Sequence, residues 1–109
     1  MAQIIKVLGQ STPSAASLTT LYTVPALSSS VISSIVICNI SATPTSFRVA
    51  IRPAGASISN EHYIYYDVAI PGNDTFIATI GITLGAGDVV RVYNTLATLS
   101  FNFYGQENT

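Results

Sequence analysis

The side chains with which this chain could do acid–base, nucleophilic or metal chemistry are few: one histidine, one cysteine and five carboxylates. His62 would need a carboxylate partner to act as a general base, and Glu61 and Asp67 are the nearest in sequence. Glu61 is its immediate neighbour at the mouth of a loop. Asp67 falls on the opposite face of the strand predicted here, because successive strand side chains alternate. The spacing gives no catalytic pair, and we expect a protein that is not an enzyme.

The remaining reactive groups have a structural interpretation. Cys38 is the single cysteine and sits among apolar residues, which favours a buried structural thiol over a nucleophile and fits folding in a reducing cytoplasm. The histidine, cysteine and carboxylates show no metal-ligand spacing. The glycine-rich segment 85–87 is followed by no helix that would supply a phosphate site, so it reads as a turn. We therefore expect no catalytic residue, no metal, no cofactor and no small-molecule substrate.

Composition points to a protein that associates with other protein. Hydrophobic residues make up 49% of the 109 residues and charged residues 8%, where roughly 25% charged is ordinary for a soluble domain. With 13 Ser and 12 Thr, hydroxyl groups must cover most of the surface. A net charge of -1 gives little repulsion between copies. We therefore expect a subunit that is bound to other protein surfaces in an assembly.

Two classes of partner are disfavoured. Four cations, Lys6, Arg48, Arg52 and Arg91, are too few and too scattered to neutralise a nucleic-acid backbone. No apolar run approaches the roughly 20 residues that a membrane-spanning helix needs. The N-terminus also lacks a charged segment followed by an apolar one, so no signal peptide is expected.

The pattern of the chain predicts strands throughout. Apolar residues alternate with polar ones, β-branched residues are frequent, and turn-forming residues recur at short intervals. The predicted strands are 4–10, 18–24, 31–40, 45–52, 62–70, 75–84, 89–93 and 96–104. Residues 35–37 are apolar on both faces, which is typical of a central strand or of one covered by another subunit. We expect an all-β, antiparallel β-sandwich or jelly roll of about eight strands.

A single domain of this size divides into three parts by composition. Residues 1–17 read as an N-terminal strand or arm with its connector, 18–105 as the sandwich core, and 106–109 as a C-terminal tail. An N-terminal arm could lie on a neighbouring protein or add a strand to the edge of its sheet.

The stretch 47–70 holds the most informative outward side chains. Two alternating runs, 47–52 and 63–70, are joined by a Pro/Gly/Ser loop, and in the second run we expect Ile64, Tyr66, Val68 and Ile70 to share the buried face. Tyr63, Tyr65 and Asp67 would then point outward, as would Arg48 and Arg52 from the first run and Tyr93 from a later strand.

These outward tyrosines and arginines have three interpretations. They could pack across strands, anchor a protein–protein interface, or stack on a sugar ring. Low charge and the absence of Trp favour packing or an interface over a sugar. The arginines are expected to pair with Asp67, Asp88 or a neighbouring subunit's carboxylates. The candidate interface residues are Ile4, Ile5, Val7, Arg48, Arg52, Tyr63, Tyr65, Arg91 and Tyr93.

Segments along nearly the whole chain resemble small virion proteins encoded by tailed bacteriophages. They are IIKVLGQ (4–10), LYTVPA (21–26), IVICNISA (35–42), FRVAIRPAG (47–55), HYIYYDVAIPGNDT (62–75) and GDVVRVYNTLATLSFNFYG (87–105). The resemblance implies a structural protein of the virion. Within the virion, a capsid decoration (cement) protein fits best, because the chain is a lone domain with no coiled coil and no fibre repeat.

What this resemblance implies is an assembly role. Cement proteins are small, β-rich and often trimeric, and they bind the major capsid protein across capsomers and stabilise the expanded head. The implied partners are further copies of this chain, as a homotrimer, and the major capsid protein; the implied place is the capsid surface, after synthesis in the host bacterial cytoplasm. A tail, baseplate or fibre component is the alternative within the virion, and a host-surface (glycan) binding module is the alternative of another class.

Overall fold

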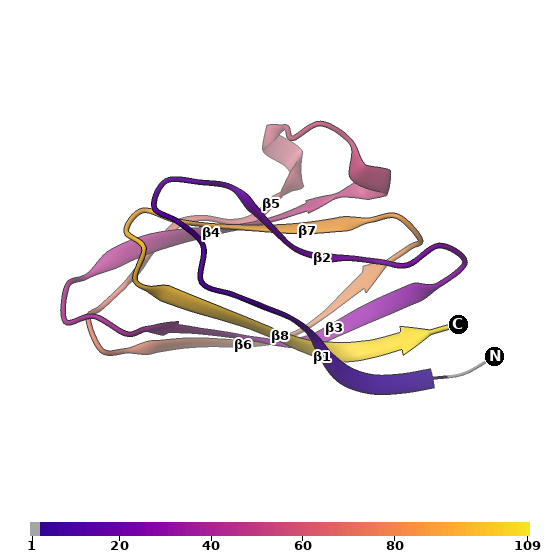
Figure 1. The fold of residues 1–109 in the computed structure, drawn as a ribbon, viewed down its shortest axis with the longest axis horizontal. Helices are drawn as coiled ribbons and strands as arrows, with labels where there is room; N and C mark the ends of the chain where they lie inside the picture. Colours follow the sequence, from indigo (N-terminus) through magenta and orange to yellow (C-terminus); the bar gives the residue numbers. More distant parts are fainter. Residues whose placement is uncertain (1–2) are drawn as a thin grey trace.

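In a computed structural model, which describes residues 3–109, the chain forms two four-stranded antiparallel sheets (Figure 1). Sheet A has the order β1-β8-β3-β6 and sheet B the order β2-β7-β4-β5. The strands are β1 (Gln3–Ser11), β2 (Thr19–Thr23), β3 (Ser29–Asn39), β4 (Thr45–Arg52), β5 (Tyr63–Ile70), β6 (Thr75–Leu84), β7 (Val89–Asn94) and β8 (Leu99–Asn108). Two short 3-10 turns, η1 (Pro53–Gly55) and η2 (Asn60–His62), join β4 to β5. The predicted antiparallel sandwich is confirmed.

The strand pairs follow one simple pattern. β1 pairs with β8, β2 with β7, β3 with β6 and β4 with β5, so the two halves of the chain run alongside each other like a long hairpin. Successive pairs alternate between sheet A and sheet B. The hairpin is thus wrapped over itself, and its two layers face each other across the core (Figure 1). β3 lies between β8 and β6, which confirms the central strand predicted from residues 35–37.

The core lies between the sheets and takes alternate residues of each strand. In β8 buried and half-buried positions alternate without interruption, as expected for a strand with one face against the core. Three fully buried phenylalanines, Phe47, Phe101 and Phe103, are its largest side chains. Burying one such side chain contributes about 1.5–3 kcal/mol, so the three rings together stabilise the packing of the two layers by roughly 5–9 kcal/mol.

Both ends of the described chain belong to sheet A. β1 pairs with β8 from Gln3↔Asn108 to Ser11↔Phe101, so this part of the predicted arm is an edge strand of the same molecule. Residues 1–2 of the arm lie outside the described residues. β8 continues to Asn108, which makes residues 106–108 strand where a tail was predicted. The tail was predicted because residues 106–108 (QEN) have weak strand propensity. In the structure, pairing with β1 on one side and β3 on the other holds them extended.

A buried polar contact links the sheets at this end. The Tyr22 hydroxyl of β2 donates to Glu107 Oε2 of β8 at 2.5 Å, and therefore accepts from the Ser30 hydroxyl of β3 at 2.7 Å. Lys6 Nζ lies 3.3 Å from Glu107 Oε1. Burial and the carboxylate neighbour raise the pKa of Tyr22 to about 12. The donated hydroxyl, with help from Lys6, lowers the pKa of Glu107.

We predict that Tyr22→Phe lowers the free energy of unfolding by about 1–3 kcal/mol, because it leaves a buried carboxylate without its hydroxyl donor. Urea unfolding at pH 7 measures this change. Because the pKa of Glu107 is lowered, this carboxylate stabilises the folded parent at pH values above 4.5, its ordinary pKa. The contribution is lost as the pH falls below that value. The raised pKa of Tyr22 stabilises the fold below pH 10.0, and this contribution is lost as the pH rises toward 12. The loss of stability at low pH and the loss at high pH should therefore both be smaller in Tyr22→Phe than in the parent.

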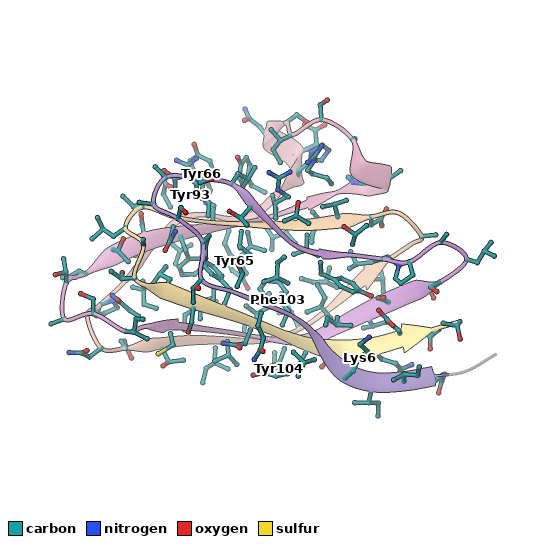
Figure 2. The ribbon with its side chains drawn as sticks, viewed as in Figure 1. Lys6, Tyr65, Tyr66, Tyr93, Phe103 and Tyr104 are labelled. Atoms are coloured by element: carbon teal, nitrogen blue, oxygen red, sulfur yellow. The ribbon has the colours of Figure 1, made fainter. Side chains whose placement is uncertain are left out.

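Tyr104→Phe is the matched control, because Tyr104 is half-buried and points away from sheet B (Figure 2). Its effect should stay within about 0.5 kcal/mol. Equal losses for the two variants would contradict the role given to the Tyr22 hydroxyl.

Candidate interaction surfaces

A bulge in β5 decides which tyrosines face outward. Phe47 pairs with Val68 and Val49 pairs with Tyr65, so Tyr66 and Asp67 together oppose Arg48. Asp67 takes up the extra residue with a φ of 51°, in the left-handed region that Asp tolerates better than most residues. Side chains on the two sides of the bulge therefore alternate in opposite phase.

The predicted orientation of the 63–70 run holds for Asp67, Val68 and Ile70, which lie after the bulge or in it, and is wrong for Ile64, Tyr65 and Tyr66 before it. Tyr65 points into the core, where its ring packs edge-on against Phe47 at 6.1 Å and Phe76 at 5.2 Å between centroids. Tyr66, predicted to be buried, is 56% exposed. Figure 2 shows Tyr65 between the sheets and Tyr66 beyond the outer side of sheet B. An unbroken alternation cannot reveal a bulge, although the Asp within the run was a weak signal for one.

The outward residues around this bulge form an arginine stack, composed of Arg48, Tyr66, Tyr93 and Asp67. The Arg48 guanidinium carbon lies 4.2 Å from the centroid of the Tyr66 ring and 4.4 Å from that of Tyr93. Arg48 also donates to both Asp67 carboxylate oxygens, at 2.6 and 3.3 Å. These hydrogen bonds raise the pKa of Arg48. A cation held by two rings and a carboxylate is rigid, and the predicted Arg48–Asp67 pair is confirmed.

Arg52 and Arg91 do not pair with Asp67 or Asp88 within the chain, because their guanidinium groups donate to backbone carbonyls; pairing with a neighbouring subunit's carboxylates stays a prediction. Arg52 donates to the carbonyls of Gly55 and Ala56 in the β4–β5 loop. Arg91 donates to the Leu18 carbonyl at 2.5 Å. Asp88, the predicted partner, instead accepts backbone N–H groups from the turns around it. Both arginines fasten loops to the outer side of sheet B.

A shallow depression adjoins the arginine stack. Asn60, Tyr63 and Tyr66 line a volume of about 420 Å³ beside the β4–β5 loop, which projects above sheet B (Figure 1). The Tyr63 and Tyr66 rings meet edge to face at 4.9 Å. His62 is not among the residues that line this depression. Its Nδ1 accepts the Ser59 backbone N–H at 3.1 Å and so caps the turn η2.

The outer face of sheet A differs from that of sheet B, because it carries no charged side chain within residues 3–109. We call it the uncharged face. The register aligns its residues in rows such as Gln10–Asn102–Val36–Ile77. Its members are Ile5, Val7 and Gln10 of β1, Ser100, Asn102, Tyr104, Gln106 and Asn108 of β8, Val31, Ser34, Val36 and Cys38 of β3, and Thr75, Ile77, Thr79, Gly81 and Thr83 of β6.

The uncharged face is apolar and hydroxylated at once. Ile5 is 86% exposed and Ile77 66% exposed, and they lie near opposite edges of the sheet. Gln10 Nε2 donates to Asn102 Oδ1 at 2.7 Å across the middle of the face. A second depression of about 300 Å³ opens beside Ile5 and Val31. Cys38, predicted to be buried, is only half-buried, because it points away from the core.

The predicted interface residues thus do not form one surface, and Tyr65 among them packs against the core. Ile5 and Val7 lie on the uncharged face, and Ile4 pairs with Glu107 on the other side of β1. Arg48, Tyr93 and Tyr63 lie at the arginine stack or beside it. Sequence reasoning missed Tyr66 because of the bulge, and it missed the uncharged face because no strand order was assigned.

Residues 3–109 hold neither a metal-binding cluster nor a membrane-spanning helix. They contain no group of three or more His, Cys, Asp or Glu side chains placed to hold a metal ion. They also contain no helix of the length and apolarity that would cross a membrane.

Comparison with known proteins finds no matching family model, no matching curated protein and no matching solved structure. The resemblance to phage virion proteins therefore stays a prediction from the sequence.

We predict that Asp67→Ala costs about 1 kcal/mol more stability than Asp67→Asn. Both variants remove the Arg48 ion pair, which is half exposed and contributes about 0.2–1 kcal/mol. Only alanine adds the strain of a left-handed backbone without a side chain that tolerates it. Thermal or urea unfolding of the two variants beside the parent measures the difference. Equal losses would mean that the bulge conformation carries no strain.

Proposed function

We propose that this chain is a non-enzymatic structural protein of a phage virion, a capsid decoration (cement) protein that binds across capsomers and stabilises the expanded head. The observation that carries the proposal is the uncharged face. A broad sheet face with exposed Ile5 and Ile77, and with hydroxyl and amide groups between them, is suited to bury against another protein.

The physical basis of such a role is differential affinity. A protein that binds only the expanded shell stabilises that state by its binding free energy, multiplied over many copies. Charged groups would carry a desolvation cost at every contact, and the uncharged face avoids it. Asn102 and Gln106 offer both donors and acceptors to a partner without that cost.

Two further points support the proposal without deciding it. Wrapped pairing of eight strands is typical of jelly rolls, which occur in viral capsid domains and also in lectins. A fold of this kind does not by itself specify a function. The sequence resemblance adds the virion, the major capsid protein as partner, and a homotrimer; each of these stays a prediction.

We predict that Asn102→Asp reduces the number of copies bound per particle by about tenfold or more, because it places a charge in the middle of the buried contact. The change is isosteric, and the Asp side chain still accepts the hydrogen bond from Gln10. Quantitative mass spectrometry of purified virus particles counts the copies, and particles stripped with a mild chaotrope test shell integrity.

Asn73→Asp is the matched control, because Asn73 lies exposed in the β5–β6 turn at a φ of 53° that Asp also tolerates. Its occupancy should equal that of the parent. Particles that hold only a few copies, lost together with tails, would place the protein in the tail or baseplate instead. Particles without this chain would reject the virion role altogether.

A host-glycan binding module is the second candidate, favoured by the depression that Asn60, Tyr63 and Tyr66 line. An aromatic ring beside an amide is a usual way to hold a sugar, through stacking and hydrogen bonds. Under this alternative, Tyr63→Ala combined with Tyr66→Ala should abolish binding to a glycan array or to host cells. Under the main proposal the same double variant keeps its place on particles. Tyr65→Ala would not discriminate, because it removes a core ring.

A further inference from the structure

The four edge strands of the sandwich are not equally protected against pairing with another chain. Natural sheets protect their edges with charges, prolines, bulges or short strands. β1 carries Lys6 and a register shift after Val7, and β2 has five residues and a shift after Thr20. β5 carries Asp67 and two register shifts against β4. Three of the four edges are thus guarded.

β6 is the exception. It has ten residues, TFIATIGITL, with no charged residue and no proline. Within residues 3–109 its strand partner is β3 alone, so its other side presents unpaired backbone groups. The register with β3 shifts once, between Ile32 and Ser34, and is continuous from Thr75 to Thr79. These five residues form a regular, uncharged edge with strong β propensity.

We propose that β6 pairs with β6 of a second copy of this chain, antiparallel and with the two-fold axis at Ile77. This register places Ile77 opposite its own counterpart, Thr75 opposite Thr79, and Phe76 opposite Ala78. Ile77, which is 66% exposed in the single chain, then meets an identical apolar side chain. Directly opposed β-branched residues and threonines stabilise a sheet.

The sequence of β6 suits a two-fold contact in particular. In an isologous interface every residue meets a residue of the same patch, so any charge near the axis would oppose a like charge. β6 has none to oppose. A second copy of this edge is a better partner than a strand of another sequence. In the two-fold register each of the five pairs already joins two threonines or two apolar residues.

Pairing of this kind extends the uncharged face without covering it. Two copies of sheet A would form one eight-stranded sheet, in the order β1-β8-β3-β6-β6-β3-β8-β1. The inference goes beyond the proposed function and does not need it. It gives a dimer, so the homotrimer implied by the resemblance would have to use another contact.

The experiment compares Ile77→Lys with Ile5→Lys in the full chain, by sedimentation at a concentration where the parent is dimeric. Ile77→Lys places two like charges across the axis and should lower the mass twofold, to the 11.5 kDa of one chain. Ile5→Lys adds the same charge on the same face at β1 and should leave the dimer intact. Circular dichroism and unfolding curves show that both variants are folded.

Cysteine cross-linking tests the register. In a Cys38→Ser background, Ile77→Cys should form a disulfide-linked dimer on mild oxidation, because its partner lies directly opposite. Thr79→Cys should not, because the two copies of residue 79 are four residues apart along the ladder, or about 13 Å.

A parent chain that sediments as a monomer overturns the inference, and so does a dimer that survives Ile77→Lys or a cross-link at 79 without one at 77. A stable trimer insensitive to Ile77→Lys also overturns it. None of these outcomes bears on particle occupancy after Asn102→Asp, so the inference and the proposed function fail independently.

Discussion

The packing of Phe47 is the contact on which the rest of the sandwich depends. Its ring is fully buried in sheet B and meets Phe76 and Phe101 of sheet A at 5.0 and 6.3 Å between centroids. Tyr65 packs against the same ring from the neighbouring strand. Holding Tyr65 inward while Val68 is also inward requires an extra residue between them, and the bulge at Asp67 supplies it. The outward Tyr66, and with it the arginine stack, is therefore a consequence of how the core is filled.

Charge is distributed unevenly over the molecule, and this asymmetry carries more functional meaning than the small total. Arg48, Arg52 and Arg91 lie on the outer side of sheet B or at its loops, where carboxylates and carbonyls occupy them. Lys6 and Glu107 meet between the sheets. Asp74 and Asp88 serve turns through their backbone contacts. The outer face of sheet A receives none of these charges, so the two faces of the same sandwich offer very different surfaces to a partner.

The all-β class, eight strands and their approximate bounds could be predicted from the sequence, because alternation and turn residues are local signals. Tyr65 could not be placed correctly, because a bulge is a property of two strands in register and leaves only a weak trace in one of them. The extension of β8 to Asn108 depends on pairing with β1 and β3, which local propensity does not contain. The uncharged face escaped notice for the same reason: its members come from four strands, and only the strand order shows that no charge falls among them.

The free edge of β6 and the uncharged face make separate demands on a partner. Strand addition at β6 satisfies backbone groups in the plane of the sheet, and among the strongly exposed apolar residues of that face it gives only Ile77 an apolar neighbour. Ile5, on the opposite edge of sheet A, stays exposed in such a dimer. Self-association through β6 therefore cannot account for the uncharged face. The outer side chains of sheet A point out of the plane in which strands pair, so only a partner that lies against the sheet can cover them. Under the proposed function that partner is the capsid shell, and strand addition at β6 leaves this surface open to it.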